Sequence, residues 1–239
     1  DADVSAEIAG LRAANGRGYV RILEADASKD IVVMERLGSP IAKSGLTIQS
    51  QISEVTRALQ ESWQADTNGQ ELVPGERKAD WLENHLRHTP GKVGMKFDPK
   101  MIHRALDLIA NRRAAWLRQE FVLAHGDPHE YNTLAVSNEQ AAGYRLVDPD
   151  GMVFEAAYDL GILLRNWIDT YRQADPAEEL LRRAIWLSEQ TAVAKNAIIS
   201  WGFVEIVSTG IHLAELGYVE EAKDYLQLGE AVATRLTQM

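Results

Sequence analysis

Apolar residues near the start of the chain change from helical to extended spacing. Val4, Ile8 and Leu11 recur at positions i, i+4 and i+7, which predicts an amphipathic helix that the following glycines end. Short apolar runs at residues 19–24 and 31–34 flank the turn-rich segment ADASKD. The pattern therefore predicts a helix followed by a β-hairpin.

The remainder of the chain has mainly helical periodicity. The Gly-Ser-Pro segment at residues 38–40 breaks the pattern, and we expect it to be a linker. The elements expected after it are a helix around 48–59, a loop at 67–78, helices at 81–87 and 99–118, strands at 121–124, 131–136 and 144–147, and helices over about 155–238. A small α/β piece, a linker and a helical body with one β insertion define an α+β protein.

Composition excludes several kinds of function. The 239 residues include no cysteine, which excludes disulfides, thiolate metal sites and cysteine nucleophiles. The formal net charge is −10 at pH 7, which disfavours nonspecific binding to nucleic acid or to anionic membranes and favours cationic small molecules. The longest uncharged apolar run, residues 196–204, is much shorter than the ~18 residues of a membrane span. The first residues are acidic and lack the basic region of a signal peptide.

Three oxygen-bearing side chains follow short strands in the middle of the chain. Asp127 comes directly after an apolar strand, Asn132 follows five residues later, and Asp148 comes after a predicted hairpin. A carboxylate can orient or deprotonate an acceptor hydroxyl, and an amide with a second carboxylate can hold Mg²⁺, which prefers oxygen ligands. The order and spacing of these residues favour phosphoryl transfer.

The segments around these residues resemble a known family. HGDPHEYN at 125–132, VDPDG at 147–151 and AYDLG at 157–161 are similar to motifs of the protein-kinase-like phosphotransferases that modify aminoglycosides. The wider segments AEIAGLRAANGRGYVRIL, MERLG, LVDPDGMVFEAAYDLGILLRNW and WGFVEIVSTG resemble the streptomycin 6-phosphotransferase and hydroxyurea phosphotransferase group. The resemblance covers nearly the whole chain.

This resemblance implies a bilobal, protein-kinase-like fold of the α+β class. Residues 1–38 would be what remains of an N-terminal nucleotide-binding lobe, and residues 39–239 would form a helical lobe for catalysis and acceptor binding. The implied reaction transfers the γ-phosphoryl group of ATP, with Mg²⁺ as cofactor, to a hydroxyl of an aminoglycoside-like (streptomycin-type) or hydroxyurea-like acceptor. Such an enzyme would be cytoplasmic and of the antibiotic-resistance type. Its partner would be a cationic small molecule, with no nucleic-acid or membrane partner.

The resemblance also implies roles for the residues of the central motifs. Asp127 would be the catalytic residue that orients the acceptor hydroxyl, while Asn132 and Asp148 would bind Mg²⁺ and, through it, ATP. His125 and Asp159 would be structural residues that brace the catalytic loop.

Residues of the N-terminal part would bind the nucleotide. Glu7, on the first helix, corresponds to the helix glutamate that pairs with a phosphate-binding lysine in kinases. Glu35 and Leu37 lie where the kinase-like fold places its adenine-binding hinge. In the kinase-like fold a glycine-rich hairpin and a lysine-bearing strand come before the first helix, but the earliest lysine here is Lys29, in a later turn. We therefore expect the natural protein to have upstream residues that include a partner for Glu7.

Three further carboxylates are candidates for binding the acceptor. Asp150 and Glu155 flank the expected Mg²⁺ site, and Glu205 lies in the WGFVE segment that the resembled group shares. Carboxylates around a cleft attract ammonium and guanidinium groups. The expected acceptor is therefore cationic.

Two other functions fit parts of the sequence. His125, Asp127 and His129 form an H-x-D-x-H pattern that could hold the metal of a hydrolase. Such a site needs further ligands, and the only later histidine is His212, in a predicted amphipathic helix. A kinase-like protein could also bind a nucleotide without turnover, although the intact Asp-Asn-Asp set favours catalysis.

Overall fold

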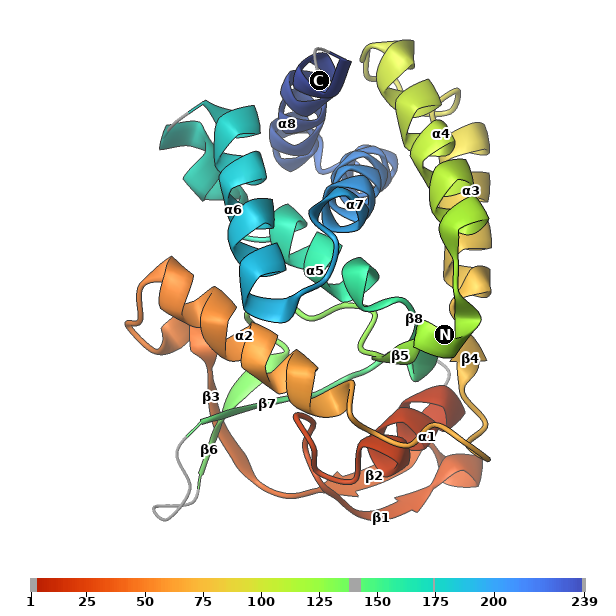
Figure 1. The fold of residues 1–239 in the computed structure, drawn as a ribbon, viewed down its shortest axis with the longest axis vertical. Coiled ribbons are helices and arrows are strands. Elements are labelled where there is room, and N and C mark those ends of the chain that lie inside the picture. Colours follow the sequence, from red (N-terminus) through yellow and green to blue (C-terminus); the bar gives the residue numbers. More distant parts are fainter. Residues whose placement is uncertain (1–3, 138–142, 174, 238–239) are drawn as a thin grey trace. The chain divides into compact units, whose positions relative to one another are not determined.

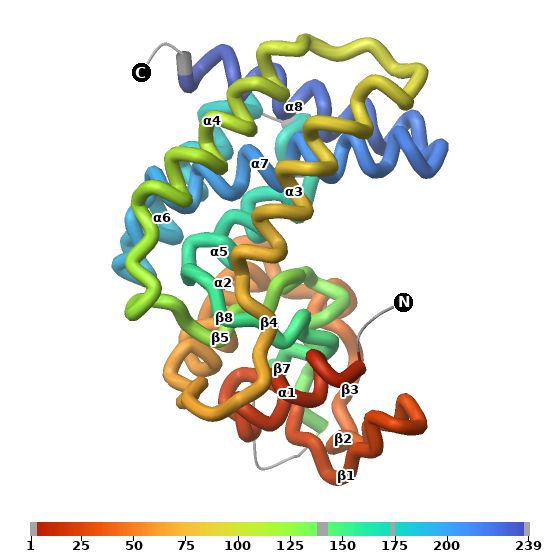
Figure 2. The backbone as a smooth tube through the Cα atoms, turned by 90° about the vertical axis from the view of Figure 1, so that its right-hand side faces the viewer, coloured from red at the N-terminus to blue at the C-terminus, as the bar shows by residue number. Residues whose placement is uncertain are grey.

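The computed structural model describes residues 4–137, 143–173 and 175–237 of the chain (Figure 1). The chain divides into two compact units, whose course along the backbone can be followed in Figure 2. Unit 1 consists of the described residues up to Gly75 together with Leu117–Asp159, and unit 2 consists of Glu76–Trp116 and the described residues from Leu160 onward. The implied functional lobes, residues 1–38 and 39–239, have other bounds and stay a prediction.

The described part of unit 1 combines three small β-sheets with helices. Its elements are α1 (Val4–Ala14), β1 (Ile22–Asp26), β2 (Ile31–Met34), β3 (Leu37–Pro40), α2 (Ile48–Ser62), β4 (Val73–Pro74), β5 (Val122–Ala124), β6 (Thr133–Val136), β7 (Tyr144–Leu146) and β8 (Met152–Phe154). The strands are ordered β1-β2, β3-β6-β7 and β4-β8-β5.

The β1-β2 hairpin confirms the hairpin predicted from the sequence, although its first strand begins at Ile22, and Tyr19 instead forms an isolated bridge with Leu146. The two strands are antiparallel, and Asp26 pairs with Ile31 at the turn. Asp26 Oδ1 accepts a hydrogen bond from the backbone N–H of Ser28 (3.1 Å), and Asp30 ends the turn with a φ of 54°. Aspartate tolerates this left-handed conformation better than most residues, which explains the turn chemistry of ADASKD.

Residues 38–40 are not the expected linker, because they belong to strand β3. Leu37 pairs with Val136 and Pro40 pairs with Leu134, both antiparallel, at one edge of the β3-β6-β7 sheet. Proline lacks a backbone N–H and is tolerated in an edge strand, where no second neighbour requires that donor. The Gly-Ser-Pro composition was therefore compatible with a strand after all.

The β4-β8-β5 sheet was missed in part, because two of its strands are too short for a periodic signal. β4 lies inside the expected loop at 67–78, and helix α3 begins there as well. The backbone N–H of Val73 donates to Gly151 O (2.8 Å), and that of Gly75 donates to Val153 O (2.9 Å). A Cβ at Gly75 would lie 2.2 Å from the Phe154 ring, so only glycine fits there.

Helix α2 packs against β5 and β7 of the same unit. Its buried face includes Ile52, Val55 and Leu59, as the helical spacing predicted. Thr47 caps its N-terminus by accepting a hydrogen bond from the backbone N–H of Ser50 (3.2 Å).

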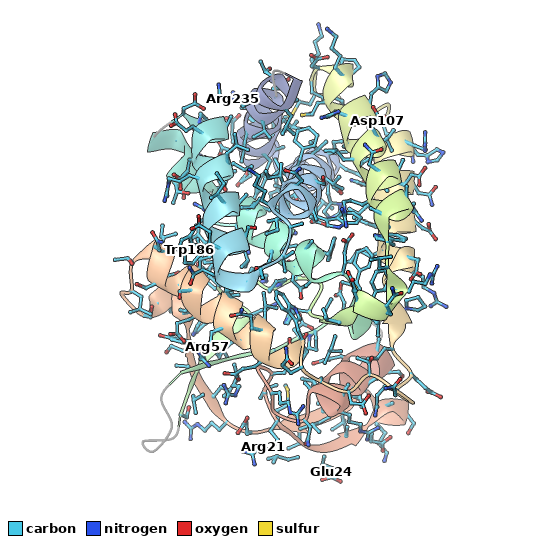
Figure 3. All side chains as sticks on the ribbon, viewed as in Figure 1. Arg21, Glu24, Arg57, Asp107, Trp186 and Arg235 are labelled. Carbon is cyan, nitrogen blue, oxygen red and sulfur yellow. The ribbon has the colours of Figure 1, made fainter. Side chains whose placement is uncertain are left out.

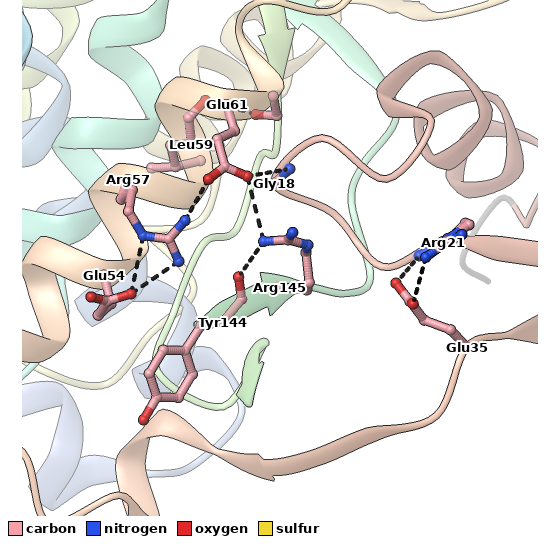
Figure 4. A network of polar contacts seen from close by, with 10 residues as sticks. Gly18, Arg21, Glu35, Glu54, Arg57, Leu59, Glu61, Tyr144 and Arg145 are labelled. Carbon is pink, nitrogen blue, oxygen red and sulfur yellow. Dashed lines mark hydrogen bonds and ion pairs between the residues drawn. The ribbon is translucent and has the colours of Figure 1, made fainter. Parts of the chain in front are cut away.

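Glu61, near the end of α2, joins three segments of unit 1 (Figure 4). Its carboxylate accepts a hydrogen bond from the backbone N–H of Gly18 (3.1 Å) and one from Arg145 Nη1 on β7 (3.4 Å). It also pairs with Arg57, which in turn lies 3.0 Å from Glu54. The Gly18 loop, α2 and β7 are thereby tied together at one carboxylate.

The described part of unit 2 is helical, as the sequence predicted for most of it. Its helices are α3 (Glu76–His88), α4 (Pro99–Ala115), α5 (Ala156–Arg165, whose first residues belong to unit 1), α6 (Pro176–Thr191), α7 (Lys195–Glu215) and α8 (Val219–Thr237). α4 is shorter than the expected 99–118, because Trp116 has extended backbone angles. Gln238, the end of the expected helical region, lies outside the described residues.

Helix α7 forms the core of unit 2 and packs against α3, α4, α6 and α8. Among the described residues it is the one helix that is long and apolar enough to cross a membrane, and 78% of its most apolar window is buried inside the protein. α5 approaches it closely: a Cβ at Gly161 would lie 2.6 Å from Trp201 Cβ. Charged residues such as Asp107 on α4 and Arg235 on α8 are exposed (Figure 3).

We predict that Gly18→Ala destabilises unit 1 strongly. A Cβ at this position would lie 1.9 Å from Ala58 O of α2, and the φ of 70° is unfavourable for alanine. Overpacking and left-handed strain together should lower the free energy of unfolding by at least about 2 kcal/mol, measured by denaturant unfolding. The control is Gly94→Ala, where a Cβ would meet no atom within 4 Å. An unchanged midpoint for Gly18→Ala would show that this close approach is absent in solution.

Candidate active site

The loop after β5 is held by one buried carboxylate. Asp159 accepts hydrogen bonds from the backbone N–H groups of His125 (3.0 Å) and Gly126 (3.0 Å), and from Trp63 Nε1 (3.2 Å). Burial raises the pKa of Asp159 to about 6, although these donors favour its charged form. Asp159 therefore braces the start of the loop that carries Asp127, as expected.

His125 is fully buried, and both of its ring nitrogens are occupied. Nδ1 accepts a hydrogen bond from the backbone N–H of Asp127 (3.2 Å), and Nε2 lies 3.0 Å from the carbonyl oxygen of Val147. A carbonyl only accepts and a backbone N–H only donates, so the ring is neutral with its proton on Nε2. Burial lowers the pKa of His125 to about 4. The H-x-D-x-H metal-hydrolase hypothesis is therefore wrong, because His125 has no nitrogen left for a metal.

Backbone hydrogen bonds join the Asp127 loop to the turn that carries Asp148. The N–H of Asp150 donates to His125 O (2.8 Å), and the N–H of Val147 donates to Asn132 O (2.9 Å). These bonds bring Asn132 next to the turn at Asp148. Asp148 itself is exposed and has a φ of 60°, a left-handed conformation that is uncommon for residues other than glycine.

Asn132 and Asp148 fit a magnesium site with few protein ligands. Asn132 Nδ2 donates to Asp127 O (3.3 Å), so the amide nitrogen is used and the amide oxygen is the atom suited to a cation. No group of three His, Asp or Glu side chains with metal-site geometry exists among the described residues. Mg²⁺ keeps several waters and needs only one or two carboxylates besides substrate phosphates, so two oxygen ligands suffice.

Helix α1 places Glu7 near Asp148. α1 packs closely on the turn: a Cβ at Gly10 would lie 2.9 Å from Gly151 Cα, and one at Gly151 would lie 1.8 Å from Ala6 O. Partial burial, followed by the negative charge of Asp148, raises the pKa of Glu7. Glu7 thus lies at the edge of the expected phosphate site, and its pairing with a lysine stays a prediction.

The two residues predicted for the adenine hinge lie between β2 and β3. The Glu35 side chain is used within the hairpin, because Oε1 accepts a hydrogen bond from the backbone N–H of Arg21 (2.9 Å) and Oε2 lies 3.4 Å from its guanidinium (Figure 4). Leu37 opens β3 opposite Val136. Only backbone groups of this segment are therefore suited to bind adenine, and the hinge stays a prediction.

The predicted acceptor residues lie in different surroundings. Asp150 packs on the loop, because a Cβ at Gly126 would lie 2.3 Å from Asp150 Oδ2. Glu155 precedes α5, and its carbonyl accepts a hydrogen bond from the N–H of Tyr158 (2.9 Å). Glu205 belongs to unit 2, where its side chain is 7% exposed and lies 3.1 Å from Arg165 Nη1, which compensates its charge. Their roles in acceptor binding stay predictions.

Two residues that contact Asp159 or His125 could not be identified from the sequence. Trp63 donates to Asp159 across 96 positions of sequence, and no local signal reveals such a contact. Tyr19 is fully buried and packs edge-on against His125, with ring centroids 5.4 Å apart. The sequence pattern indicates only that Tyr19 belongs to an apolar run.

Solved structures with a similar fold include several small-molecule kinases. The chain resembles a thermostable mutant of the aminoglycoside phosphotransferase APH(4)-Ia, with a TM-score of 0.61 and 11% identity over 98% of this chain and 84% of that one. It also resembles an ethanolamine kinase of Plasmodium vivax, with a TM-score of 0.56 and 14% identity over 97% of this chain and 70% of that one. A choline kinase of Cryptosporidium parvum matches with a TM-score of 0.55 and 16% identity over 100% of this chain and 77% of that one. The α+β, kinase-like fold predicted from the sequence is thereby confirmed.

The family follows from the sequence itself. Residues 3–217 match the family described as aminoglycoside/hydroxyurea antibiotic resistance kinase. Because the match covers most of the chain, the protein belongs to the aminoglycoside/hydroxyurea antibiotic resistance kinase family, and the resemblance stated above is confirmed. Its class is that of small-molecule kinases. No curated protein sequence gives a match.

We predict that the His125 ring stays neutral down to about pH 5. Its pKa is about 4 in the folded chain against 6.5 for an ordinary imidazole, so the unfolded state binds the proton more readily. The stability that neutral His125 contributes is complete above about pH 6.5 and is lost as the pH falls toward 4. The raised pKa of Asp159 acts in the opposite direction, since its contribution grows as the pH falls from about 6 to 4. The ring must therefore be observed directly by NMR.

Ring ¹⁵N and ¹H shifts between about pH 5 and pH 8 provide the measurement. We expect the Nε2–H tautomer throughout, with no titration of His125 in this range, while an exposed imidazole titrates near 6.5. A midpoint between pH 6 and 7 for His125 would contradict the buried, hydrogen-bonded arrangement.

Proposed function

We propose that this protein transfers the γ-phosphoryl group of ATP to a hydroxyl of a small acceptor of the aminoglycoside or hydroxyurea type, as an antibiotic-resistance enzyme. The observation that carries this proposal is the pair of backbone hydrogen bonds from Val147 and Asp150, which join the Asp127 loop to the Asp148 turn. These bonds support the proposal because they connect the segment that carries Asp127 and Asn132 to the segment that carries Asp148. Membership of the kinase family supports the same reaction.

The chemistry assigned to each residue follows from its position. Asp127 would orient the acceptor hydroxyl and accept its proton as the oxygen attacks the γ-phosphorus; the bond from the γ-phosphorus to the β,γ-bridging oxygen breaks, and ADP leaves. Asn132 and Asp148 would hold Mg²⁺, which neutralises phosphate charge when bound. Glu7, beside Asp148, would orient a cationic group at the phosphates.

The acceptor class is inferred from charge. The chain carries a net charge of −10, and Asp150 and Glu155 lie on either side of the segment that leads from the Asp148 turn to α5. The similar solved structures are named for aminoglycosides, ethanolamine and choline, which all combine a hydroxyl with a cationic nitrogen. A streptomycin-type acceptor therefore fits better than neutral hydroxyurea. The use of ATP is compatible with a cytoplasmic enzyme.

We predict that Asp127→Asn abolishes most of the turnover. General-base assistance is typically worth about 10²–10⁴-fold, so kcat should fall at least about 10²-fold while the KM for ATP changes little. The measurement is coupled ADP release by the natural full-length protein with a panel of streptomycin, hydroxyurea, ethanolamine and choline. The wild type should respond to at least one acceptor of the panel.

A matched variant controls for the charge change. Asp107→Asn alters an exposed carboxylate on α4 and should leave kcat unchanged. Near-normal turnover of Asp127→Asn with an acceptor that the wild type phosphorylates would refute the role of Asp127.

We predict that activity requires Mg²⁺ or Mn²⁺ and survives a zinc-selective chelator. The expected ligands, Asn132 and Asp148, offer only oxygen, which suits hard cations and binds zinc poorly without imidazole or thiolate. Asp148→Asn should raise the Mg²⁺ concentration needed for half-maximal activity, measured by ADP release at fixed ATP. Loss of activity with the zinc chelator, restored by zinc alone, would contradict the oxygen-ligand site.

A further inference from the structure

His129 organises the loop between β5 and β6 through its backbone. Its carbonyl oxygen accepts two hydrogen bonds, one from the backbone N–H of Asn132 (3.0 Å) and one from the hydroxyl of Thr133 (3.0 Å). The loop therefore turns around His129, three residues before the predicted magnesium ligand and two residues after Asp127.

The ring of His129 has a defined tautomer. The backbone N–H of Tyr131 donates to Nδ1 (3.1 Å), and a backbone N–H can only donate. Nδ1 therefore carries no proton, and the neutral ring bears its proton on Nε2. Nε2 is the nitrogen that faces Asp127, 3.7 Å from Oδ2.

We infer that His129 is a positioning residue for Asp127: its Nε2–H holds one carboxylate oxygen and so restricts rotation of the catalytic carboxylate. The inference rests on the proposed function of Asp127. The distance of 3.7 Å is longer than a hydrogen bond, and contacts of this kind commonly tighten when substrates bind. The two side chains are 28% and 42% exposed, so the contact lies at an accessible surface where an acceptor can reach the carboxylate.

The neutral ring suits this role better than a cation would. An N–H donor orients a carboxylate by a directional interaction without adding a positive charge beside it. His129 acts on the reaction through Asp127 and not by contact with the reacting atoms.

Two substitutions separate the side-chain contact from the support of the loop. In His129→Gln the amide nitrogen can take the place of Nε2 and donate to Asp127, whereas the acceptor for the Tyr131 N–H is lost. In His129→Asn the amide oxygen can take the place of Nδ1 and accept from Tyr131, whereas the donor to Asp127 is lost. We expect His129→Asn to lower kcat about tenfold with the KM for ATP unchanged, and His129→Gln to retain most of the wild-type kcat.

The reverse order would overturn the inference, since near-normal kcat for His129→Asn with low kcat for His129→Gln means that the ring only supports the loop. Equal kcat values for the two variants would overturn it as well. Unfolding midpoints identify a variant that fails to fold. His103→Gln, at an exposed histidine of α4, is the matched control and should leave kcat unchanged.

A double variant distinguishes this inference from the proposed function. If His129 acts through Asp127, adding His129→Asn to Asp127→Asn should change kcat by less than about twofold, because the interaction is already lost. A further tenfold loss would overturn the positioning role. Normal turnover of Asp127→Asn alone would instead refute the proposed function, whereas a loss there with normal His129 variants would refute this inference only.

Discussion

The buried carboxylate of Asp159 is the constraint on which the rest of the site depends. It accepts hydrogen bonds from the backbone N–H groups of His125 and Gly126, which are buried, and from the indole N–H of Trp63, which is partly buried. A buried carboxylate without donors would cost much free energy, and so would buried N–H groups without an acceptor. The Asp159 carboxylate and its donors therefore depend on each other. These hydrogen bonds consequently fix the course of the backbone directly after β5. Because Asp127 follows within two residues, the position of its backbone depends on the buried side chain of Asp159.

His125 transmits this constraint to the opposite segment. Its neutral ring spans from the Asp127 backbone N–H to the carbonyl of Val147, and its own carbonyl accepts from Asp150. A charged imidazole could not accept from Asp127, so the arrangement requires the burial that keeps the ring neutral. The Asp127 loop and the Asp148 turn are therefore held together by main-chain geometry. The side chains of Asp127 and Asp148 take no part in this connection, which is made by backbone groups and by the His125 ring.

Periodicity predicted the long elements well and the short ones poorly. The helix at Val4–Ala14, the strand at Ile31–Met34 and the apolar face of α2 follow from spacing alone, whereas β4 and β8 are two or three residues long and carry no period. Asp127, Asn132 and Asp148 could be proposed because each stands at a strand end within one stretch of sequence. Trp63 could not, since its contact with Asp159 depends on how α2 packs within unit 1. The positioning role inferred for His129 could not be predicted from the sequence for another reason. It depends on which ring nitrogen carries the proton, and the contact with the Tyr131 N–H decides that.

Asp159 and the neighbouring carboxylates Asp148 and Glu7 lie in two contrasting environments of unit 1. Asp159 is buried and accepts hydrogen bonds from three N–H donors, so its charge is compensated within the fold. Asp148, at a positive φ, and Glu7, whose pKa is raised by partial burial and by Asp148, instead lie close to each other with like charges. The negative charge of Asp148 disfavours ionisation of Glu7, and a cation bound beside the two groups would offset this effect. Tight backbone contacts at Gly10 and Gly151 keep α1 against this turn, so the fold itself holds Glu7 close to a negatively charged side chain.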